Sequence, residues 1–359
     1  VLRRRTFAII SHPDAGKTTL TEKLIYHGGL IHEAGEVKGK SGTKAATSDW
    51  MALEQQRGIS ITSSVMQFEY HGLRVNLLDT PGHKDFSEDT YRTLIAADSA
   101  VMLIDMAKGV EDRTKKLYEV CRYRNMPIFT FVNKIDREGK TPLELIDDIE
   151  STLKMSCYPV TWPIGSGGLL HGIYHRLRNT IILFDGTHAE ETTTEIPVEG
   201  IDDPKWKELI HPEVLAMCRE ELELITGALG DFEPDRFLKG EVSPVMFGSA
   251  KQDFAVDVFL DFFKDHAPAP TLRKAKTGII NPLDQNFTGF VFKMQANMDR
   301  RHRDRVAFIR ICSGKFERGM KVQHNRLNRE IRLAFSNQFV AQDRETVDEA
   351  FAGDIVGVS

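Results

Sequence analysis

The stretch SHPDAGKTTL, residues 11–20, directly follows the apolar run TFAII and decides the fold. A glycine, a lysine and two threonines between a short strand and a helix are typical of a phosphate-binding loop. Gly16 would let the backbone approach a phosphate, Lys17 would bridge the β- and γ-phosphates, and the Thr18 hydroxyl would bind Mg²⁺. Ser11 stands where such loops usually carry their first glycine, so an ordinary turn before an amphipathic helix stays open as an alternative.

A second motif, LLDTPGH, ends another apolar run at Asp79. A carboxylate at the end of a strand beside a phosphate loop can hold Mg²⁺, usually through water. The amide of Gly82 could contact a γ-phosphate. This motif therefore strengthens the prediction of a nucleoside triphosphate site.

A third motif, NKID at 133–136, again ends an apolar strand. The Asp136 carboxylate would accept hydrogen bonds from the N1–H and exocyclic amine of guanine, and adenine offers neither donor there. Asn133 would orient the loop, and the stem of Lys134 would lie over the base. A fourth motif, GSA at 248–250, would direct backbone amides at the guanine carbonyl oxygen. Four such motifs at strand ends match the place where an open α/β sheet binds its ligand, and they favour GTP.

Apolar runs alternate with helical patterns through the first 270 residues, which predicts an open α/β sheet with helices on both faces. We expect strands at 4–10, 64–70, 73–80, 100–105, 126–133 and 243–250, and helices at 18–29, 112–125, 141–154 and 255–266. Residues 35–58 read as a long loop, of the kind that is usually functional or disordered, and 166–240 as an insertion with its own short elements. The aromatic stripe FLDFFKDH is expected to be helix core.

Residues 267–278, APAPTLRKAKTG, read as a linker, and we place the domain boundary at 270/271. Short strands with glycine turns follow, which predicts a β-barrel or sandwich over 271–359. The last residues, GDIVGVS, read as a strand in mid-course, so we expect this second domain to be partial.

The overall composition argues against several classes of protein. A net charge of −5 argues against a globally basic nucleic-acid coat, although a local basic patch stays open. The four cysteines are scattered without a CxxC pair, which fits neither a disulfide framework nor a zinc site and favours a reduced, cytoplasmic setting. No apolar run approaches the length of a membrane span, so no membrane partner is expected.

The motifs SHPDAGKTT, RGIS, DTPGH and NKID resemble those of the translational GTPases, relatives of the elongation factors. More narrowly, ATSDWM, SVMQF, DFSEDTYRTL and FTGFVFKMQANM followed by HRDRVAF resemble the bacterial peptide chain release factor three family, over essentially the whole chain. The resemblance implies a GTPase domain followed by an elongation-factor-type β-barrel and a further domain.

The resemblance also implies roles for individual residues. His83 would orient the attacking water, and Ser60 stands where related factors carry the threonine that completes the Mg²⁺ shell, with Thr62 as a competitor. Catalysis is thus assigned to His83 and Lys17, and Mg²⁺ binding to Thr18, Ser60 and Asp79. The expected contacts to GTP or GDP are Ser11, His12, Pro13, Asp14, Ala15, Gly16, Lys17, Thr18, Thr19, Gly82, Asn133, Lys134, Asp136, Gly248, Ser249 and Ala250.

The function implied is ribosome-stimulated GTP hydrolysis in translation termination, which promotes dissociation of stop-codon-reading release factors. The expected partners are the bacterial ribosome, both rRNA and ribosomal proteins, and indirectly those release factors, with the protein itself a monomer. The basic cluster DRRHRDR at 299–305 is either a solvated hairpin tip or an rRNA contact. Alternatives are a translocation or ribosome-protection GTPase, a P-loop kinase or ATPase, and a guanine-nucleotide sensor without catalysis.

Overall fold

The computed structural model describes residues 1–29, 64–80, 87–184, 195–296, 305–333, 336–340 and 343–358. The chain divides into two compact units, each assembled from separate segments. The first unit contains Val1–Ile9, Ile25–Ser99 and Ala267–Ser359, and the second contains Ile10–Leu24 and Ala100–His266.

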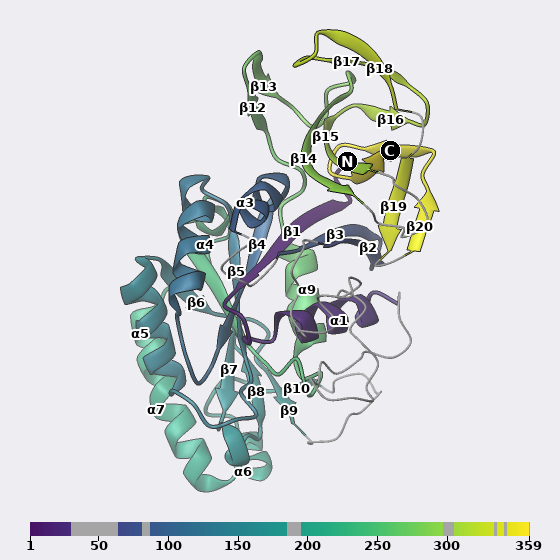
Figure 1. Ribbon diagram of the computed structural model, residues 1–359. Helices are drawn as coiled ribbons and strands as arrows, with labels where there is room; N and C mark the ends of the chain where they lie inside the picture. Colours follow the sequence, from purple (N-terminus) through teal and green to yellow (C-terminus); the bar gives the residue numbers. More distant parts are fainter. Residues whose placement is uncertain are drawn as a thin grey trace. The chain divides into compact units, whose positions relative to one another are not determined.

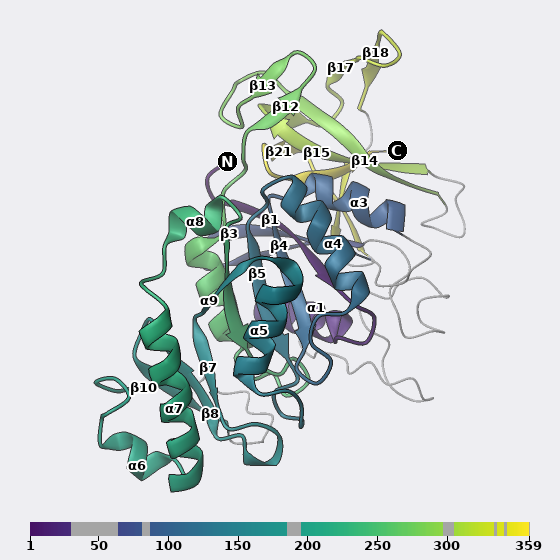
Figure 2. The same ribbon diagram turned by 90° about the vertical axis from the view of Figure 1, so that its left-hand side faces the viewer.

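Four parallel strands form the sheet of the second unit. They are hydrogen-bonded in the order β4 (Ser99–Asp105), β5 (Ile128–Asn133), β11 (Val242–Phe247) and β6 (Ser156–Pro159). Every residue of β4, β5 and β11 is buried, as expected of parallel strands covered on both faces. The helices α4 (Asp112–Tyr123) and α5 (Pro142–Leu153) cover one face, and α1 (Lys17–His27) and α9 (Val256–His266) cover the other (Figures 1 and 2). The predicted α/β architecture is confirmed.

Short-range signals set the ends of α5. The Thr141 hydroxyl accepts a hydrogen bond from the Glu144 amide at 3.3 Å, and the Glu144 carboxylate accepts one from the Thr141 amide at 2.8 Å. This capping box satisfies amides that the first turn of a helix leaves without partners. Pro142 occupies the first turn, where its missing N–H costs nothing. The helix start predicted at Thr-Pro is therefore confirmed.

The aromatic stripe of α9 packs into the core of the second unit, as predicted. Phe259 and Phe263 are 0% and 1% exposed, and their rings lie 5.4 Å from Phe131 and 5.2 Å from Phe129. Ring pairs at such centroid separations add to the stability that burial alone provides. The stripe is structural, and it anchors α9 beneath the strands that end at the candidate site.

A smaller antiparallel sheet lies between β6 and β11 in the sequence. Its strand order is β10 (Glu195–Pro197), β9 (Thr180–Leu183), β8 (Gly172–His175), β7 (Thr161–Ile164). It is followed by α6 (Lys205–Leu209), α7 (Pro212–Ala228) and α8 (Pro234–Leu238), which Figure 2 shows in succession. The predicted insertion at 166–240 misses β7, because four residues with an internal proline carry too short a pattern to read as a strand.

In the first unit, β1 (Arg4–Ser11) pairs in parallel with β3 (Leu73–Asp79), and β2 (Ser64–Tyr70) pairs antiparallel with β3. The β2–β3 turn falls at His71 and Gly72, as predicted. Their φ angles are 45° and 80°, and two successive positive values fit the tight turn that a two-residue hairpin loop requires. The helix α3 (Ser87–Ala96) follows.

The rest of the first unit is almost entirely strands, which confirms the predicted all-β region. A five-stranded sheet has the order β14 (Thr288–Ala296), β15 (Arg305–Ser313), β22 (Ile355–Val358), β19 (Ser336–Val340), β20 (Asp343–Thr346). Three two-stranded pairs accompany it: β12 (Arg273–Ala275) with β13 (Gly278–Ile280), β16 (Lys315–Glu317) with β21 (Glu349–Phe351), and β17 (Lys321–His324) with β18 (Arg329–Arg332). Its core centres on Ile311, Phe316 and Val356, all fully buried.

A buried carboxylate, Asp98, joins α3 to the β-rich part of the first unit. Its Oδ1 accepts hydrogen bonds from Arg273 Nη2 at 2.9 Å and from the Thr271 hydroxyl at 3.3 Å, and its Oδ2 accepts one from Arg310 Nη2. Asp98 and Arg310 have side chains 0% and 1% exposed. Residues 267–278 are consequently ordered by this contact and by the β12–β13 hairpin, whereas the sequence predicted a linker.

A second polar contact ties the strands of the first unit to the loop before β22. The Gly353 carbonyl accepts hydrogen bonds from the Thr6 hydroxyl at 2.8 Å and from the Asn76 amide at 3.1 Å. Nearby, Arg4 Nε donates to Asp354 Oδ2 at 2.8 Å. These side chains belong to β1 and β3, so both strands are fixed by residues more than 270 positions away.

Candidate nucleotide-binding site

The loop between β1 and α1 has the backbone of an anion-binding loop. Asp14 and Gly16 have φ angles of 69° and 98°, and Ala15 donates its amide to the His12 carbonyl at 3.3 Å. Left-handed residues alternating with ordinary ones turn successive amides toward one side, which suits phosphate oxygens. The helix begins at Lys17, one residue earlier than predicted, so its positive N-terminal end directly follows the loop.

Gly16 is required by a close neighbour as well as by its φ angle. A Cβ at this position would lie 2.3 Å from Nδ2 of Asn133, far inside van der Waals contact. Any side chain here would therefore displace Asn133 as well as strain the backbone.

Asn133, at the end of β5, fastens two loops of the site together. Its Nδ2 donates to the Ala15 carbonyl at 2.9 Å, and its Oδ1 accepts from the Ala250 amide at 2.8 Å. The residue is 2% exposed, so these bonds are shielded from water. Asn133 thus fixes the position of the phosphate loop relative to the 248–250 loop.

Lys134 lies beside the phosphate loop in a left-handed conformation, with φ of 71°. Its Nζ donates to the Asp14 carbonyl at 2.5 Å and to Asp105 Oδ2 at 2.7 Å. Burial raises the pKa of Asp105, but hydrogen bonds from Lys134 and from the Ala107 amide outweigh it and hold that pKa below the ordinary value. The ion pair with Asp105 therefore fixes the ammonium group of Lys134 next to the phosphate loop.

Asp105 is a member of this network that the sequence patterns did not identify. It is the last residue of β4 and is 5% exposed. A carboxylate ending an apolar strand next to the NKID strand is a usable signal, the same one that identified Asp79. His12 also has a partner that was not predicted, since its Nδ1 lies 3.1 Å from Glu111 Oε2.

Asp136 carries the most informative feature of the site. Its Oδ1 is buried and has no hydrogen-bond partner within the described part of the chain. A buried acceptor left unpaired costs free energy, and a ligand that supplies a donor recovers it. Guanine offers two adjacent donors, its N1–H and its 2-amine, and adenine has neither at these positions, so the residues present fit guanine.

The backbone amides of the 248–250 loop, which were expected to contact guanine, form hydrogen bonds within the protein. The Gly248 amide donates to the Val132 carbonyl at 2.9 Å, the Ser249 amide to Phe254 O at 3.0 Å, and the Ala250 amide to Asn133. All three amides are thus engaged within the protein. A guanine oxygen would have to share one of these bonds, so the predicted amide contact stays a prediction, while the loop's observed role is to hold Asn133.

The other residues predicted for the site have the following locations. Thr18 and Thr19 lie in the first turn of α1, Lys17 and Ser11 are buried, and the Ser11 hydroxyl has no hydrogen-bond partner among the described residues. Asp79 ends β3 and is fully buried. Ser60, Thr62, Gly82 and His83 lie outside the described residues, so their roles stay predictions. Within the described ranges, no group of three or more His, Cys, Asp or Glu side chains could hold a metal ion.

Comparisons with known proteins place the chain in a family. The model of the elongation factor Tu GTP-binding domain matches residues 2–269, and that of elongation factor G domain 2 matches residues 286–359. Proteins named peptide chain release factor 3 are 56% identical in Gloeobacter violaceus, 56% in Symbiobacterium thermophilum and 55% in Synechocystis. These matches cover 99%, 100% and 99% of this chain and 67%, 68% and 65% of those relatives, so the chain spans about two thirds of their length.

A solved structure from Thermus thermophilus matches with a TM-score of 0.77 over 99% of this chain and 52% of that one. At 24% identity this likeness supports the fold alone. In the described ranges, no helix is long and apolar enough to cross a membrane. The two domain models and the identity to three relatives lead to one conclusion: the chain belongs to the peptide chain release factor 3 family, translation termination factors with an elongation-factor-type GTP-binding domain.

Proposed function

We propose that this chain binds GTP at the corner formed by Asn133, Lys134 and Asp136, and hydrolyses it on the bacterial ribosome during termination. The observation that carries the proposal is the buried, unpaired Oδ1 of Asp136, beside a lysine held by Asp105. A donor-bearing purine edge satisfies that oxygen, and adenine leaves it unsatisfied.

The described residues support binding and orientation of the substrate. Backbone N–H groups of the loop before α1, apart from Pro13, which has none, and the N-terminus of α1 would face the charge that develops on the phosphates, and Lys17 would add a cation there. Thr18 and Asp79 would hold Mg²⁺, together with Ser60 or Thr62. When bound, that ion supplies charge compensation on the β- and γ-phosphates.

His83 would orient the attacking water, and the ribosome would place it, so hydrolysis by the isolated chain is expected to be slow. The GTP-bound form would promote dissociation of stop-codon-reading release factors, and hydrolysis would then let the protein leave the ribosome. We propose that it acts in the cytoplasm as a monomer. The names of the relatives support this role over translocation, ribosome protection or nucleotide sensing.

The test measures GTP hydrolysis and release-factor dissociation on ribosomes stalled at a stop codon after peptide release. The wild-type chain should show ribosome-stimulated hydrolysis, and His83→Ala should lower it by about a hundredfold or more. Binding of a fluorescent GTP analogue should be unchanged in this variant, and an excess of ATP should not compete. Fast hydrolysis without ribosomes, or equal competition by ATP, would contradict the proposal.

A further inference from the structure

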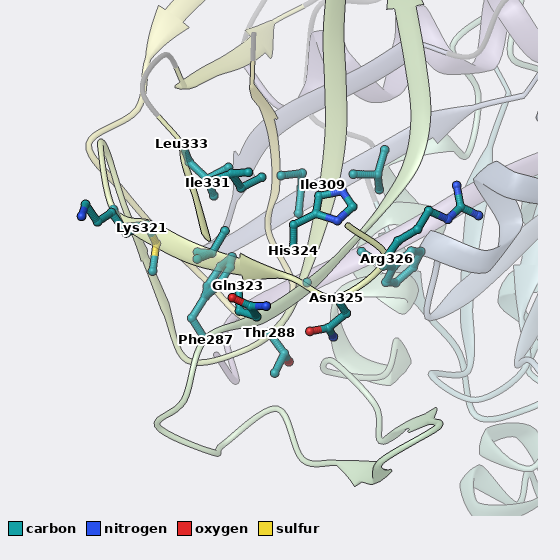
Figure 3. Close-up of a pocket in the computed structure, with 15 residues that line it drawn as sticks. Phe287, Thr288, Ile309, Lys321, Gln323, His324, Asn325, Arg326, Ile331 and Leu333 are labelled. Carbon is teal, nitrogen blue, oxygen red and sulfur yellow. The ribbon is translucent and has the colours of Figure 1, made fainter. Parts of the chain in front are cut away.

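Two cavities in the β-rich part of the first unit, of about 780 and 770 Å³, lie along β14. Figure 3 shows that aromatic, aliphatic and cationic side chains all line the first of them, among them Phe287, Ile309 and Arg326. Such a mixed lining selects no single class of ligand. A more specific set of contacts lies in the second unit, where the connection between β4 and α4 supports the phosphate loop.

This connection, residues 105–111, has a backbone fixed by hydrogen bonds. The Gly109 amide donates to the Asp105 carbonyl at 2.8 Å, which closes a turn at the end of β4. The Met106 amide donates to the Asn133 carbonyl at 3.0 Å. Since these bonds join backbone groups, the connection is fixed relative to β5 whatever its side chains do.

A carboxylate of α5 holds the other end of the connection. Asp148 Oδ2 accepts hydrogen bonds from the Val110 amide at 3.1 Å and from Lys140 Nζ at 2.8 Å. Gly109 has a φ angle of 75°, and a Cβ at this position would overlap Asp148 Oδ2. The connection thus packs directly against α5, which makes it a rigid support for the side chains that leave it.

Asp105 gives the phosphate loop its first support, through Lys134. The ammonium group of Lys134 donates to Asp105 Oδ2 at 2.7 Å and to the Asp14 carbonyl at 2.5 Å. Asp14 and Lys134 have left-handed φ angles of 69° and 71°, which are unfavourable for residues other than glycine. Such conformations persist where the surroundings hold them. One ammonium group, fixed by a carboxylate that is 5% exposed, contacts both strained residues here.

Glu111, the residue before α4, gives the second support, through His12. Its Oε2 lies 3.1 Å from His12 Nδ1, and the two side chains are 23% and 26% exposed. The same Nδ1 lies 2.7 Å from the Pro13 carbonyl, so this nitrogen carries the proton and shares it between two acceptors. The His12 carbonyl accepts from the Ala15 amide at 3.3 Å. The pair therefore fixes the residue on which the turn of the phosphate loop closes.

We propose that Asp105 and Glu111 are positioning residues that keep the phosphate loop in its binding shape and so slow the release of the guanine nucleotide. Asp105 acts through Lys134, and Glu111 acts through His12. A loop that is already ordered does not have to be ordered on binding, and its loss of order acts mainly on the dissociation rate. The inference rests on the proposed GTP site and adds what sets the lifetime of the complex.

Stopped-flow fluorescence on the whole chain, residues 1–359, measures that lifetime. The protein is loaded with GDP that carries an N-methylanthraniloyl label, and an excess of unlabelled GDP displaces it. Asp105→Asn should speed release by about tenfold, because it removes the charge that fixes the ammonium group, and Glu111→Gln by about threefold. The preference for guanine over adenine should be unchanged in both, since neither variant alters Asp136.

The matched control is Glu195→Gln in the small antiparallel sheet of the same unit. It breaks an ion pair of similar length and exposure, since Glu195 Oε1 lies 2.9 Å from Arg178 Nη1 and the two side chains are 32% and 34% exposed. This control should change the release rate by less than about twofold.

A double-mutant cycle separates positioning from a general loss of structure. Lys134→Met keeps the apolar stem and removes the ammonium group, so it should itself speed release. Adding Asp105→Asn to Lys134→Met should then speed release by less than about twofold further, because the group through which Asp105 acts is already gone. A carboxylate with a merely structural role would speed release by the same factor in both backgrounds.

Three results would overturn the inference while leaving the GTP site in place. They are a release rate unchanged by Asp105→Asn, an equally large effect of Asp105→Asn in the Lys134→Met background, and an effect of Glu195→Gln as large as that of Glu111→Gln. A wild-type chain that does not bind the labelled GDP would instead contradict the proposed function, and the inference with it.

Discussion

Two carboxylates with buried oxygens, those of Asp98 and Asp136, have opposite surroundings. Asp98 in the first unit accepts hydrogen bonds on both oxygens from Arg273, Arg310 and Thr271. Asp136 in the second unit leaves Oδ1 buried and unpaired among the described residues. The protein satisfies both oxygens of Asp98, which suits a structural role, whereas the unpaired Oδ1 of Asp136 could accept a hydrogen bond from a ligand.

The largest expected effect on stability comes from Asp98→Asn. Removing the negative charge leaves two largely buried arginines without this counterion, so we expect the free energy of unfolding to fall by about 3–5 kcal/mol. Urea denaturation followed by circular dichroism measures this. The matched control is Asp348→Asn, whose partner Arg318 and own side chain are exposed, and which should cost about 1 kcal/mol or less. Equal losses in the two variants would show that the burial of Asp98 adds nothing to the stability of its ion pairs.

Asp136→Asn should change the specificity for the nucleotide base and leave the stability of the fold largely unchanged. The amide cannot accept both donors of guanine, so we expect GTP affinity to drop by about a hundredfold or more, with little loss in the free energy of unfolding. The amide can donate to the oxygen that xanthine carries in place of the amine, so xanthosine triphosphate should bind better than it does to the wild type. Titration with both fluorescent nucleotides decides this. A variant that retains GTP preference would show that another residue reads the base.

The smallest expected effect concerns pH and the Lys134–Asp105 pair. Because hydrogen bonds hold the pKa of Asp105 below its ordinary value in the folded protein, the pair stabilises the fold above about pH 4. That contribution is lost as the pH falls through the folded-state pKa. Asp105→Asn should therefore lower the free energy of unfolding by about 1 kcal/mol at neutral pH, and the gap from the wild type should close toward about pH 2.

Urea denaturation of the wild type and Asp105→Asn across this pH range gives the measurement. A gap between wild type and Asp105→Asn that widens toward acid pH would contradict the assignment of the pair.

The features that the sequence predicts correctly are those that local forces determine. The capping box at Thr141, the turn at His71 and Gly72, and the buried strands were all predictable, because neighbouring residues determine them. The NKID spacing also predicts that Asp136 reads guanine, and that assignment stays a prediction.

Non-local contacts account for what the sequence did not reveal. The partner of Lys134, Asp105, is 29 positions away, and the residues that order 267–278 include Asp98, more than 170 positions away. No pattern within a window of the sequence reports such pairs. The engaged amides of the 248–250 loop likewise depend on Asn133 and Phe254, whose positions only the fold defines.

The hydrogen bonds from Thr6 and Asn76 to Gly353 have a consequence for biosynthesis. At the speed of translation, roughly tens of seconds separate the emergence of β1 from that of its distant acceptor. Until then the first strand lacks one of the groups that hold it, while the helices and parallel strands of the second unit can already assemble. We therefore expect the second unit to fold during synthesis before β1 is fixed in the first unit. Pulse-labelling of ribosome-bound chains of increasing length would reveal that order.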